Sequence, residues 1–445
     1  MFLHGTSRIN EKGHLEIGGL DTTDLVSRYG TPLYVYDETM IRQTIREYKQ
    51  AFATAGLRHQ IAFASKAFCC LAMCRLIDEE GLALDVVSSG ELVTALEAGF
   101  PAERIHFHGN NKTPFEIEQA LNAGIGEYVV DNFHELRLLG AMASEKGMTA
   151  NILLRLTPGV EAHTHEYIST GQEDSKFGFD MTSDMAERAV RAALNTEGVR
   201  LIGLHSHIGS QIFETEGFAV AVEIVSKFYG ECVRNFGAEH LYKLNVGGGF
   251  GIRYTEEDTP LPASHYVEAI ASAVQGAFDQ LGLAYPEIVI EPGRSIVGAA
   301  GTTLYTIGST KDIPGVRKYV SVNGGMTDNP RPALYQAQYE AMLANRASEA
   351  SEEIVSIAGK ACESGDMLIW DVALPKVQAD DILAVSCTGA YGYSMASNYN
   401  RIARPAVVFV QNGQADLVIR RESDRDLLSH DLIPARMVSE ALTNR

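Results

Sequence analysis

Short apolar runs alternate with amphipathic stretches through the middle of the chain. Eight such runs lie between residues 61 and 293, and each is followed by a stretch whose apolar residues have helical spacing. Four of these stretches end in glycine, which commonly terminates a helix. They lie at 115–124, 134–147, 184–198 and 265–282. The runs are predicted strands at 61–65, 84–87, 104–107, 128–130, 152–156, 201–204, 241–246 and 288–290.

This alternation predicts a parallel sheet that closes into a barrel. Apolar runs of this kind are buried on both faces, as parallel strands covered by helices are. Eight strand–helix units over this length match a (β/α)8 TIM barrel, to which we assign residues 36–300.

A different pattern surrounds the barrel. After about residue 300 the segments are rich in β-branched residues, and QNGQ at 411–414 carries an Asn-Gly hairpin signal. These features predict a mainly antiparallel β-domain. The strand-like PLYVYD at 32–37 is expected to pair with it, so we assign residues 1–35 and 301–445 together to a sandwich or barrel-like β-domain.

The amino-acid composition limits the classes of molecule that the protein is expected to bind. The 37 basic and 57 acidic residues give a net charge of −20, which disfavours nucleic acids and anionic membranes as partners. The N-terminus lacks a secretory apolar core and no run has membrane-spanning length, so we expect a cytoplasmic protein. The six cysteines show no CxxC spacing, which argues against a disulfide framework or a zinc ribbon.

Polar residues gather where the predicted strands end, which is where barrels carry their active sites. Taken singly, each is as well explained as a solvated loop residue. Their convergence on one rim favours an active site. They are Lys66, Ser88 to Gly90, Gly109, Asn110, Asp131, Arg155, His205, His207, Gly247 to Gly249, Glu291 and Arg294.

Lys66 stands between the apolar segments IAFAS and AFCCLAMC. We expect its amine to be partly desolvated and therefore nucleophilic toward carbonyl groups, as in Schiff-base chemistry. The alternative is a lysine that extends past an apolar strand end into solvent.

Two motifs at the last strands suit a phosphorylated ring. The glycines of NVGGGFG (245–251) would let backbone N–H groups approach a phosphate, although a tight turn explains them too. In IVIEPGRSI, Glu291 suits a protonated ring nitrogen and Arg294 suits a phosphate or carboxylate. An ordinary ion pair between these two residues is the alternative.

The HxH pattern of His205 and His207 is also found in metal-dependent barrels. Those barrels place HxH at the first strand and a lysine later, the reverse of the order here. A second HxH, at His163 and His165, follows no strand at the right distance. We therefore expect a neutral His207 stacked on a flat cofactor ring, and no metal.

Together the motifs FASKA, HSHIGSQ, GGGFG, EPGR, CESGD and GAYGYSMASNYN resemble the diaminopimelate decarboxylases, pyridoxal-phosphate enzymes with an alanine-racemase-like barrel of fold type III. The resemblance runs from PLYVYDE to ASNYN. It implies that Lys66 forms a Schiff base with pyridoxal 5'-phosphate, that Glu291 binds the pyridinium nitrogen and that His207 stacks on the ring. The implied phosphate and cofactor contacts are Ser210, Gly247, Gly248, Gly249, Pro292, Gly293, Arg294 and Tyr391.

The resemblance also implies a homodimer with a shared active site. Cys362, in CESGD, would protonate the reaction intermediate from the neighbouring subunit. A buried structural thiol is the usual alternative for a cysteine, but the neighbouring Glu363 and Asp366 make an apolar pocket improbable. The implied substrate contacts are Arg294, Arg331, Tyr335, Glu363 and Tyr391.

The expected reaction is decarboxylation of meso-2,6-diaminopimelate to L-lysine and CO2. A carboxylate at position 291 deepens the electron sink that loss of CO2 requires, whereas related racemases place an arginine there. Arg331 suits the distal carboxylate of this substrate and Glu363 its ammonium. The alternatives are a decarboxylase of ornithine, arginine or a carboxylated polyamine, and a non-catalytic pyridoxal-phosphate protein.

Overall fold

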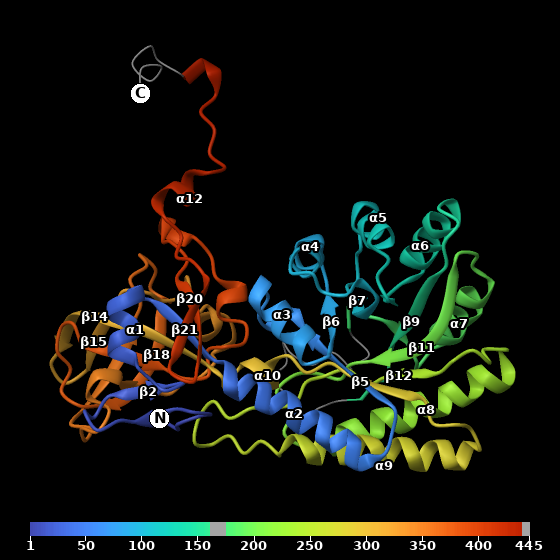
Figure 1. Cartoon of the computed structure of the whole chain (residues 1–445), viewed down its shortest axis with the longest axis horizontal. Coiled ribbons are helices and arrows are strands. Elements are labelled where there is room, and N and C mark those ends of the chain that lie inside the picture. The colour runs from blue at the N-terminus through green and yellow to red at the C-terminus, as the bar shows by residue number, and fades with distance from the viewer. Residues whose placement is uncertain (161–174, 438–445) are drawn as a thin grey trace.

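The computed structural model of the protein describes residues 1–160 and 175–437. A helix-covered barrel and a β-domain lie side by side, and the long helix α2 (Glu38–Ala55) runs from one to the other (Figure 1). His163 and His165 lie outside the described residues.

The barrel is closed by eight parallel strands, as predicted. Each strand pairs with the next along the chain, β8 with β9 and β13 with β5 included, and the two-residue β10 (Phe179–Asp180) adds to β9. The ring consists of β5 (His59–Ala64), β6 (Ala83–Val86), β7 (Ile105–Phe107), β8 (Glu127–Val130), β9 (Ala150–Thr157), β11 (Val199–Ser206), β12 (Lys243–Asn245) and β13 (Glu287–Ile290).

Helices cover the outside of the ring, and the four stretches with a clear helical period are all helical. The covering helices are α3 (Leu71–Glu79), α4 (Ser89–Glu97), α5 (Pro114–Ala123), α6 (Phe133–Glu145), α7 (Met185–Asn195), α8 (Glu216–Asn235) and α9 (Ala263–Leu281). Local sequence fixes their ends: α5 begins with a capping box of Thr113 and Glu116 and ends at Gly124, which is left-handed with φ 68°.

The prediction of a helical stretch after every strand is wrong for the eighth. Only the one-turn α10 (Arg294–Val297) follows β13 before the chain enters the β-domain. Helix α2, which precedes β5, packs against α9 and α10 instead. A helix from the start of the barrel therefore covers the gap that an eighth helix would fill.

The β-domain is a mainly antiparallel sheet that includes a strand from the N-terminal segment. As expected for PLYVYD, β4 pairs with β14 (antiparallel) and with β20 (parallel), and it extends to Asp37, slightly beyond the boundary predicted at residue 36. β20 and β21 form the predicted hairpin. The strands are β4 (Leu33–Asp37), β14 (Gly301–Ile313), β15 (Arg317–Val322), β16 (Ala341–Leu343), β17 (Glu353–Ala358), β18 (Met367–Leu374), β19 (Ile382–Val385), β20 (Ala406–Gln411) and β21 (Gln414–Ile419).

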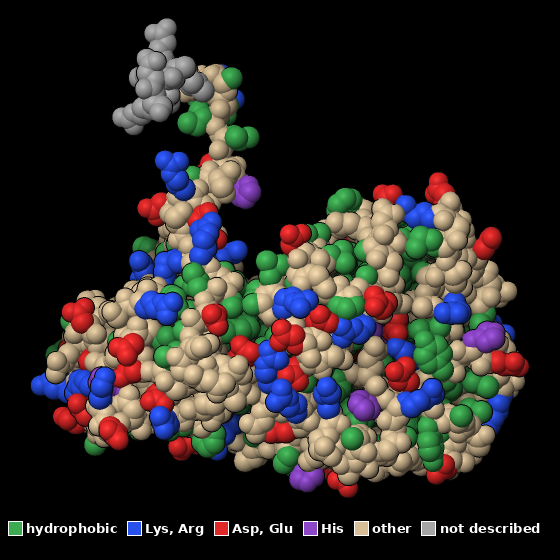
Figure 2. Space-filling model, in the orientation of Figure 1, with side chains coloured by type: hydrophobic (Ala, Val, Ile, Leu, Met, Phe, Trp, Pro, Cys, Tyr) green, Lys and Arg blue, Asp and Glu red, His purple; other side chains and the backbone are tan. Residues whose placement is uncertain are grey.

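The remaining elements are small. An N-terminal sheet consists of β1 (Arg8–Ile9), β2 (Leu15–Ile17) and β3 (Leu20–Asp21), followed by α1 (Thr22–Tyr29); α11 (Arg331–Tyr335) and α12 (Asp424–Leu428) lie in the C-terminal part. All six cysteines are free thiols. None of the helices in the described ranges combines the length and apolar character of a bilayer span. Acidic and basic side chains are interspersed over the face seen in Figure 2.

Candidate active site

Two adjoining cavities lie where the carboxyl ends of the barrel strands meet the β-domain. The inner compartment, about 410 Å³, occupies the barrel mouth and includes Lys66, His108, Arg155, Glu291 and Gly293 in its wall. The outer compartment, about 480 Å³, extends toward the β-domain. Five residues line both compartments, which therefore form one site: Lys66, His207, Ser210, Arg294 and Tyr391.

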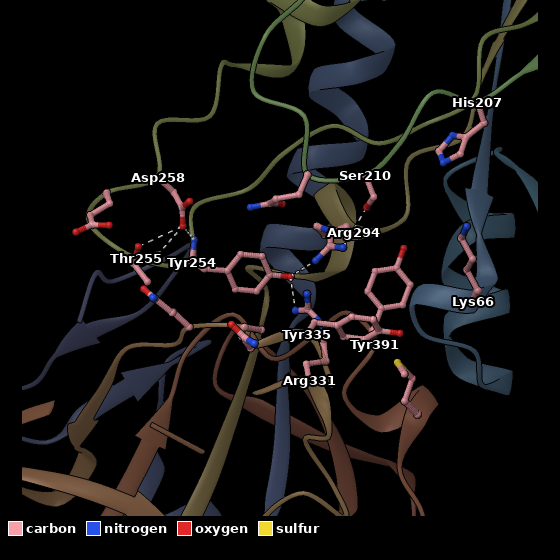
Figure 3. A pocket seen from close by; sticks show the side chains of 16 residues that line it. Lys66, His207, Ser210, Tyr254, Thr255, Asp258, Arg294, Arg331, Tyr335 and Tyr391 are labelled. Carbon is pink, nitrogen blue, oxygen red and sulfur yellow. Dashed lines mark hydrogen bonds between the residues drawn. The ribbon is translucent and has the colours of Figure 1, made fainter. Parts of the chain in front are cut away.

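The outer compartment is shown in Figure 3, with Lys66 and His207 at its barrel side. Besides the shared residues, its wall includes Tyr254, Arg331 and Tyr335. The site thus brings Lys66 together with both arginines that the sequence suggested for anionic groups.

Lys66 lies in a one-turn 3-10 helix, Ser65–Ala67, directly after β5. The expectation of a partly desolvated amine is wrong for this structure, because the residue is exposed. Its side chain extends from the strand end into the open space of both compartments, whereas its neighbours Ser65 and Ala67 are buried. An accessible amine at the boundary can react with a carbonyl group in either compartment.

Glu291, directly after β13, is held by donors from three other strands or strand ends. Asn245 Nδ2 donates to Oε1 at 2.6 Å, His205 Nε2 lies 3.2 Å from the carboxylate and His108 Nε2 lies 3.3 Å from Oε1. Burial alone would raise the pKa of Glu291, but His205 and His108 outweigh it and hold this pKa well below its usual value. Glu291 is therefore a carboxylate in the same compartment as Lys66.

His207 follows β11 and lies in the wall of both compartments. Its Nδ1 accepts a hydrogen bond from the Gly248 N–H at 3.2 Å. Burial, together with the positive charges of Lys66 and Arg155, holds the pKa of His207 well below 6.5, so its ring is neutral, as the sequence analysis expected.

The two histidines of the HxH pattern have different surroundings. Within the described residues, one possible metal-ligand group combines His205 with His108 and Glu291 and another combines Asp85, His106 and His108, and neither includes His207. The pattern at 205 and 207 therefore does not form a joint metal site here.

The glycine loop lets three strand ends approach one another closely. Gly247 (φ 72°) and Gly249 (φ 108°) are left-handed, and a Cβ at Gly248 would lie 2.0 Å from the Glu291 carbonyl oxygen. Of the three, only Gly249 reaches the inner compartment; Gly247 and Gly248 pack behind it, and Gly293 lines the wall whereas Pro292 is buried beside it.

Two buried arginines of the outer compartment are held by neutral hydroxyl groups. Arg294 donates to Tyr254 Oη at 2.5 Å and to Ser210 Oγ at 3.0 Å, and Arg331 donates to the hydroxyls of Tyr254 and Tyr339, each at 2.8 Å. Neither guanidinium forms an ion pair with a carboxylate of the described residues. Both remain available to bind an anionic group.

Cys362 and Glu363 do not line either compartment of their own chain. They lie in the loop between β17 and β18, where Cys362 is exposed and its N–H donates to Asn400 Oδ1 at 2.7 Å. The structure thus leaves these two residues free to approach another molecule.

Several residues in the walls of the site were absent from the sequence-based candidates, among them His108, Asp85 and Tyr254. His108 and Asp85 come from strand ends, and the HxH pattern of His106 and His108 could have drawn attention to them. Tyr254 lies in the irregular segment between β12 and α9, where no pattern identifies the hydroxyl that joins two arginines.

The site provides the groups that pyridoxal phosphate needs. Lys66 offers an amine, Glu291 a carboxylate for the ring nitrogen, and the backbone at Gly249 and Gly293 a surface free of side chains, with Arg294 beside it. A family model for the pyridoxal-binding domain of pyridoxal-dependent decarboxylases matches residues 38–298. The chain belongs to this family.

Known members of the family are similar to the chain over nearly its whole length. A diaminopimelate decarboxylase of Bacillus subtilis (strain 168) is 61% identical over 432 residues, which cover 97% of this chain and 98% of that protein. One from Staphylococcus aureus (strain COL) is 48% identical, with 96% and 99% covered. A crystal structure of the enzyme from M. jannaschii in complex with L-lysine is 36% identical, with a TM-score of 0.91 and 97% and 99% covered.

Proposed function

We propose that this chain is a pyridoxal-phosphate-dependent decarboxylase that converts meso-2,6-diaminopimelate to L-lysine and CO2. The observation that carries the proposal is the placement of Lys66 and the ionised Glu291 in one compartment that opens onto two arginines, neither of which pairs with an acidic side chain of the described residues. The full-length similarity to diaminopimelate decarboxylases supports the same reaction.

Pyridoxal phosphate, when bound, supplies a carbonyl group that condenses with amines and a ring that accepts the electrons released with CO2. Lys66 would hold the cofactor through its amine. Glu291 would hold a proton on the ring nitrogen, which keeps the ring electron-poor. His207, neutral and beside Lys66 in the wall, would pack on the ring without adding charge.

For the phosphate, we propose the side of the inner compartment formed by Ser210, Gly249, Gly293 and Arg294, with Gly247 and Gly248 supporting Gly249 from behind and Pro292 fixing the turn. Backbone N–H groups free of side chains and one guanidinium suit a dianion. Tyr391, which lines both compartments with the Arg294 guanidinium 4.9 Å from its ring, would separate the cofactor from the substrate's far end.

Substrate selection is assigned to the outer compartment. Arg331 and Tyr335 come from α11, and the Arg331 guanidinium is buried with only hydroxyl partners among the described residues. A buried cation of this kind favours a substrate with a distal carboxylate, and it disfavours ornithine, whose far end carries only an ammonium.

We further propose a homodimer in which Cys362 and Glu363 of one subunit complete the site of the other. Their exposed loop and their distance from the cavities of their own chain support this assignment. Cys362 would return a proton to the carbon that loses CO2, and Glu363 would bind the distal ammonium. The product is an amino acid used for protein synthesis, and we propose a cytoplasmic location.

Turnover on diaminopimelate, ornithine and arginine, measured side by side with pyridoxal phosphate present, tests the substrate assignment. We expect release of CO2 from diaminopimelate to exceed that from the other two by at least about 10- to 100-fold, the value of one charge-assisted hydrogen-bonded pair. An equal or faster rate on ornithine would refute the assignment.

Hybrid dimers test the shared site. Mixing inactive Lys66→Ala and Cys362→Ala variants should restore about a quarter of the wild-type activity, because random exchange makes half of the dimers hybrid and each hybrid has one intact site. No recovery, with subunit exchange demonstrated by mass spectrometry, would contradict a site built from two chains.

A further inference from the structure

From the wall of the inner compartment downward, the barrel interior contains an unusual number of ionisable side chains. Barrel interiors are normally packed with branched apolar residues. Here a small apolar cluster of Ala62, Ala83 and Val289 shares the interior with buried polar residues. The ionisable residues are Asp85, His106, His108, Glu127, His205 and Lys243, all at most 7% exposed.

These residues form a continuous path from Glu291 to the opposite end of the barrel. His108 Nε2 lies 3.3 Å from Glu291 Oε1 and 3.4 Å from Asp85 Oδ1. The same Asp85 oxygen lies 3.3 Å from His106 Nδ1, whose other nitrogen lies 3.7 Å from Glu127 Oε2. Glu127 forms an ion pair with Lys243.

The ends of the path lie at opposite ends of the strands. Glu291 directly follows β13, whereas Glu127 is the first residue of β8 and Lys243 the first of β12. Neither Glu127 nor Lys243 lines a compartment of the site. The residues between them are therefore the contacts that connect these two residues to the site.

Acidic and basic side chains alternate along the path. The two nitrogens of His106 face two different carboxylates without forming a hydrogen bond to either, and this pair of negative charges favours an imidazolium ion. Burial lowers the pKa of His106, but Glu127 and Asp85 outweigh it, so this pKa is raised. When His106 is cationic, its charge offsets that of the Asp85 carboxylate. The N–H group of His108 is then able to donate to Glu291.

We propose that His108, Asp85 and His106 are positioning residues that keep the Glu291 carboxylate ionised and aimed at the cofactor ring, and that Glu127 and Lys243 set their charge from the far end of the barrel. This inference rests on the proposed function, because a ring nitrogen facing Glu291 gives the arrangement its use.

Other charged groups near the path do not replace it. Lys66 and Arg155, which lies in β9, act on His207; Arg155 also acts on Glu291, and His205 contacts Glu291 directly. The pKa of His205 is lowered by burial, so His205 is a neutral donor. Glu287, 3.7 Å from Lys243 and partly exposed, is the point where the path approaches solvent.

Glu127→Gln tests the path, with Glu135→Gln as a matched control. Both glutamates are buried and ion-paired with a buried lysine, Glu127 with Lys243 and Glu135 with Lys112 at 2.7 Å, but Glu135 lies on α6, off the path. The measurement is the titration of histidine ring nitrogens by NMR in protein freed of cofactor, followed by the ring-nitrogen signal of ¹⁵N-labelled pyridoxal phosphate in the loaded protein.

In Glu127→Gln we expect the titration midpoint of His106 to fall by at least about one pH unit, because a facing carboxylate is lost. The His108 ring signals and the ring-nitrogen signal of the cofactor should shift as well, while Glu135→Gln leaves all three unchanged. Lys243→Gln should move the His106 midpoint in the opposite direction, and it serves as the test if Glu127→Gln does not fold.

Two results would overturn the inference. One is a shifted His106 midpoint with His108 and cofactor signals identical to those of Glu135→Gln, which would make the path structural only. The other is stoichiometric zinc in the purified protein that His106→Gln removes, since Asp85, His106 and His108 lie close enough to share an ion. Borohydride reduction separates these results from failure of the proposed function, because that function requires the cofactor label on Lys66 in every folded variant.

Discussion

The two compartments differ in how their charged side chains are paired. In the inner compartment a carboxylate, Glu291, is surrounded by an amide and two histidines that stabilise its negative charge. In the outer compartment two guanidiniums are held by hydroxyl groups and have no acidic partner among the described residues. The protein itself supplies the groups that stabilise the Glu291 carboxylate, whereas the guanidiniums of Arg294 and Arg331 can still bind an anionic ligand. The difference assigns the chemistry to one compartment and the choice of substrate to the other.

Lys66 belongs to both compartments, so its removal should have the largest effect. Lys66→Ala is expected to lower turnover by roughly four orders of magnitude or more, the scale of losing a catalytic nucleophile. It should also abolish the covalent label left by borohydride. Peptide mapping of the reduced wild-type protein checks the assignment, and a label on another lysine would show that the wrong amine was chosen.

Glu291→Gln should impair the inner compartment selectively. Loss of a charge-assisted hydrogen bond in a buried site costs about 3 kcal/mol, so we expect kcat to fall by at least about 100-fold with a small change in KM. Steady-state kinetics at saturating cofactor provide the measurement. A rise in KM with kcat unchanged would place Glu291 in substrate binding and remove the contrast between the compartments.

Arg331→Gln should impair the outer compartment in the complementary manner. KM for diaminopimelate should rise by about 10- to 100-fold, since one charge-assisted pair is worth about 1.5–3 kcal/mol, while kcat changes little. The ratio of activity on ornithine to that on diaminopimelate should increase. Arg331→Lys, which keeps the charge but not the planar fork, should fall between the two; wild-type selectivity in Arg331→Gln would contradict the assignment.

Tyr254→Phe should produce the smallest loss of activity, and it should affect both substrate binding and cofactor binding. Its hydroxyl accepts from both arginines, whereas that of Tyr339 accepts from Arg331 only. Losing a hydrogen bond worth about 1 kcal/mol should raise KM about fivefold and weaken retention of the cofactor through Arg294. The control Tyr339→Phe should raise KM alone, as equilibrium dialysis of the cofactor can show.

Much of the barrel and of the inner compartment could be predicted because strand ends are local features of the sequence. Lys66, His207 and Glu291 each follow an apolar run, and closure of the ring brings them together. Helix α2 could not be predicted to replace the missing eighth helix, because its position depends on packing against α9 at the other end of the barrel.

The outer compartment was harder to predict because its contacts join distant segments. Tyr254 and Arg331 meet from an irregular loop and a short helix, and no periodicity links them. The exposure of Lys66 was predicted wrongly for a similar reason: apolar neighbours in sequence do not determine how much open space faces a side chain.

The position of β4 between β14 and β20 constrains when the β-domain can fold during synthesis. The ribosome releases this strand before any of the barrel, yet both of its neighbours are translated only after the barrel is complete. Until then its backbone groups lack their final partners. We conclude that a nascent chain truncated before residue 406 lacks one neighbour of β4 and that the β-domain is completed only after translation of the C-terminal hairpin.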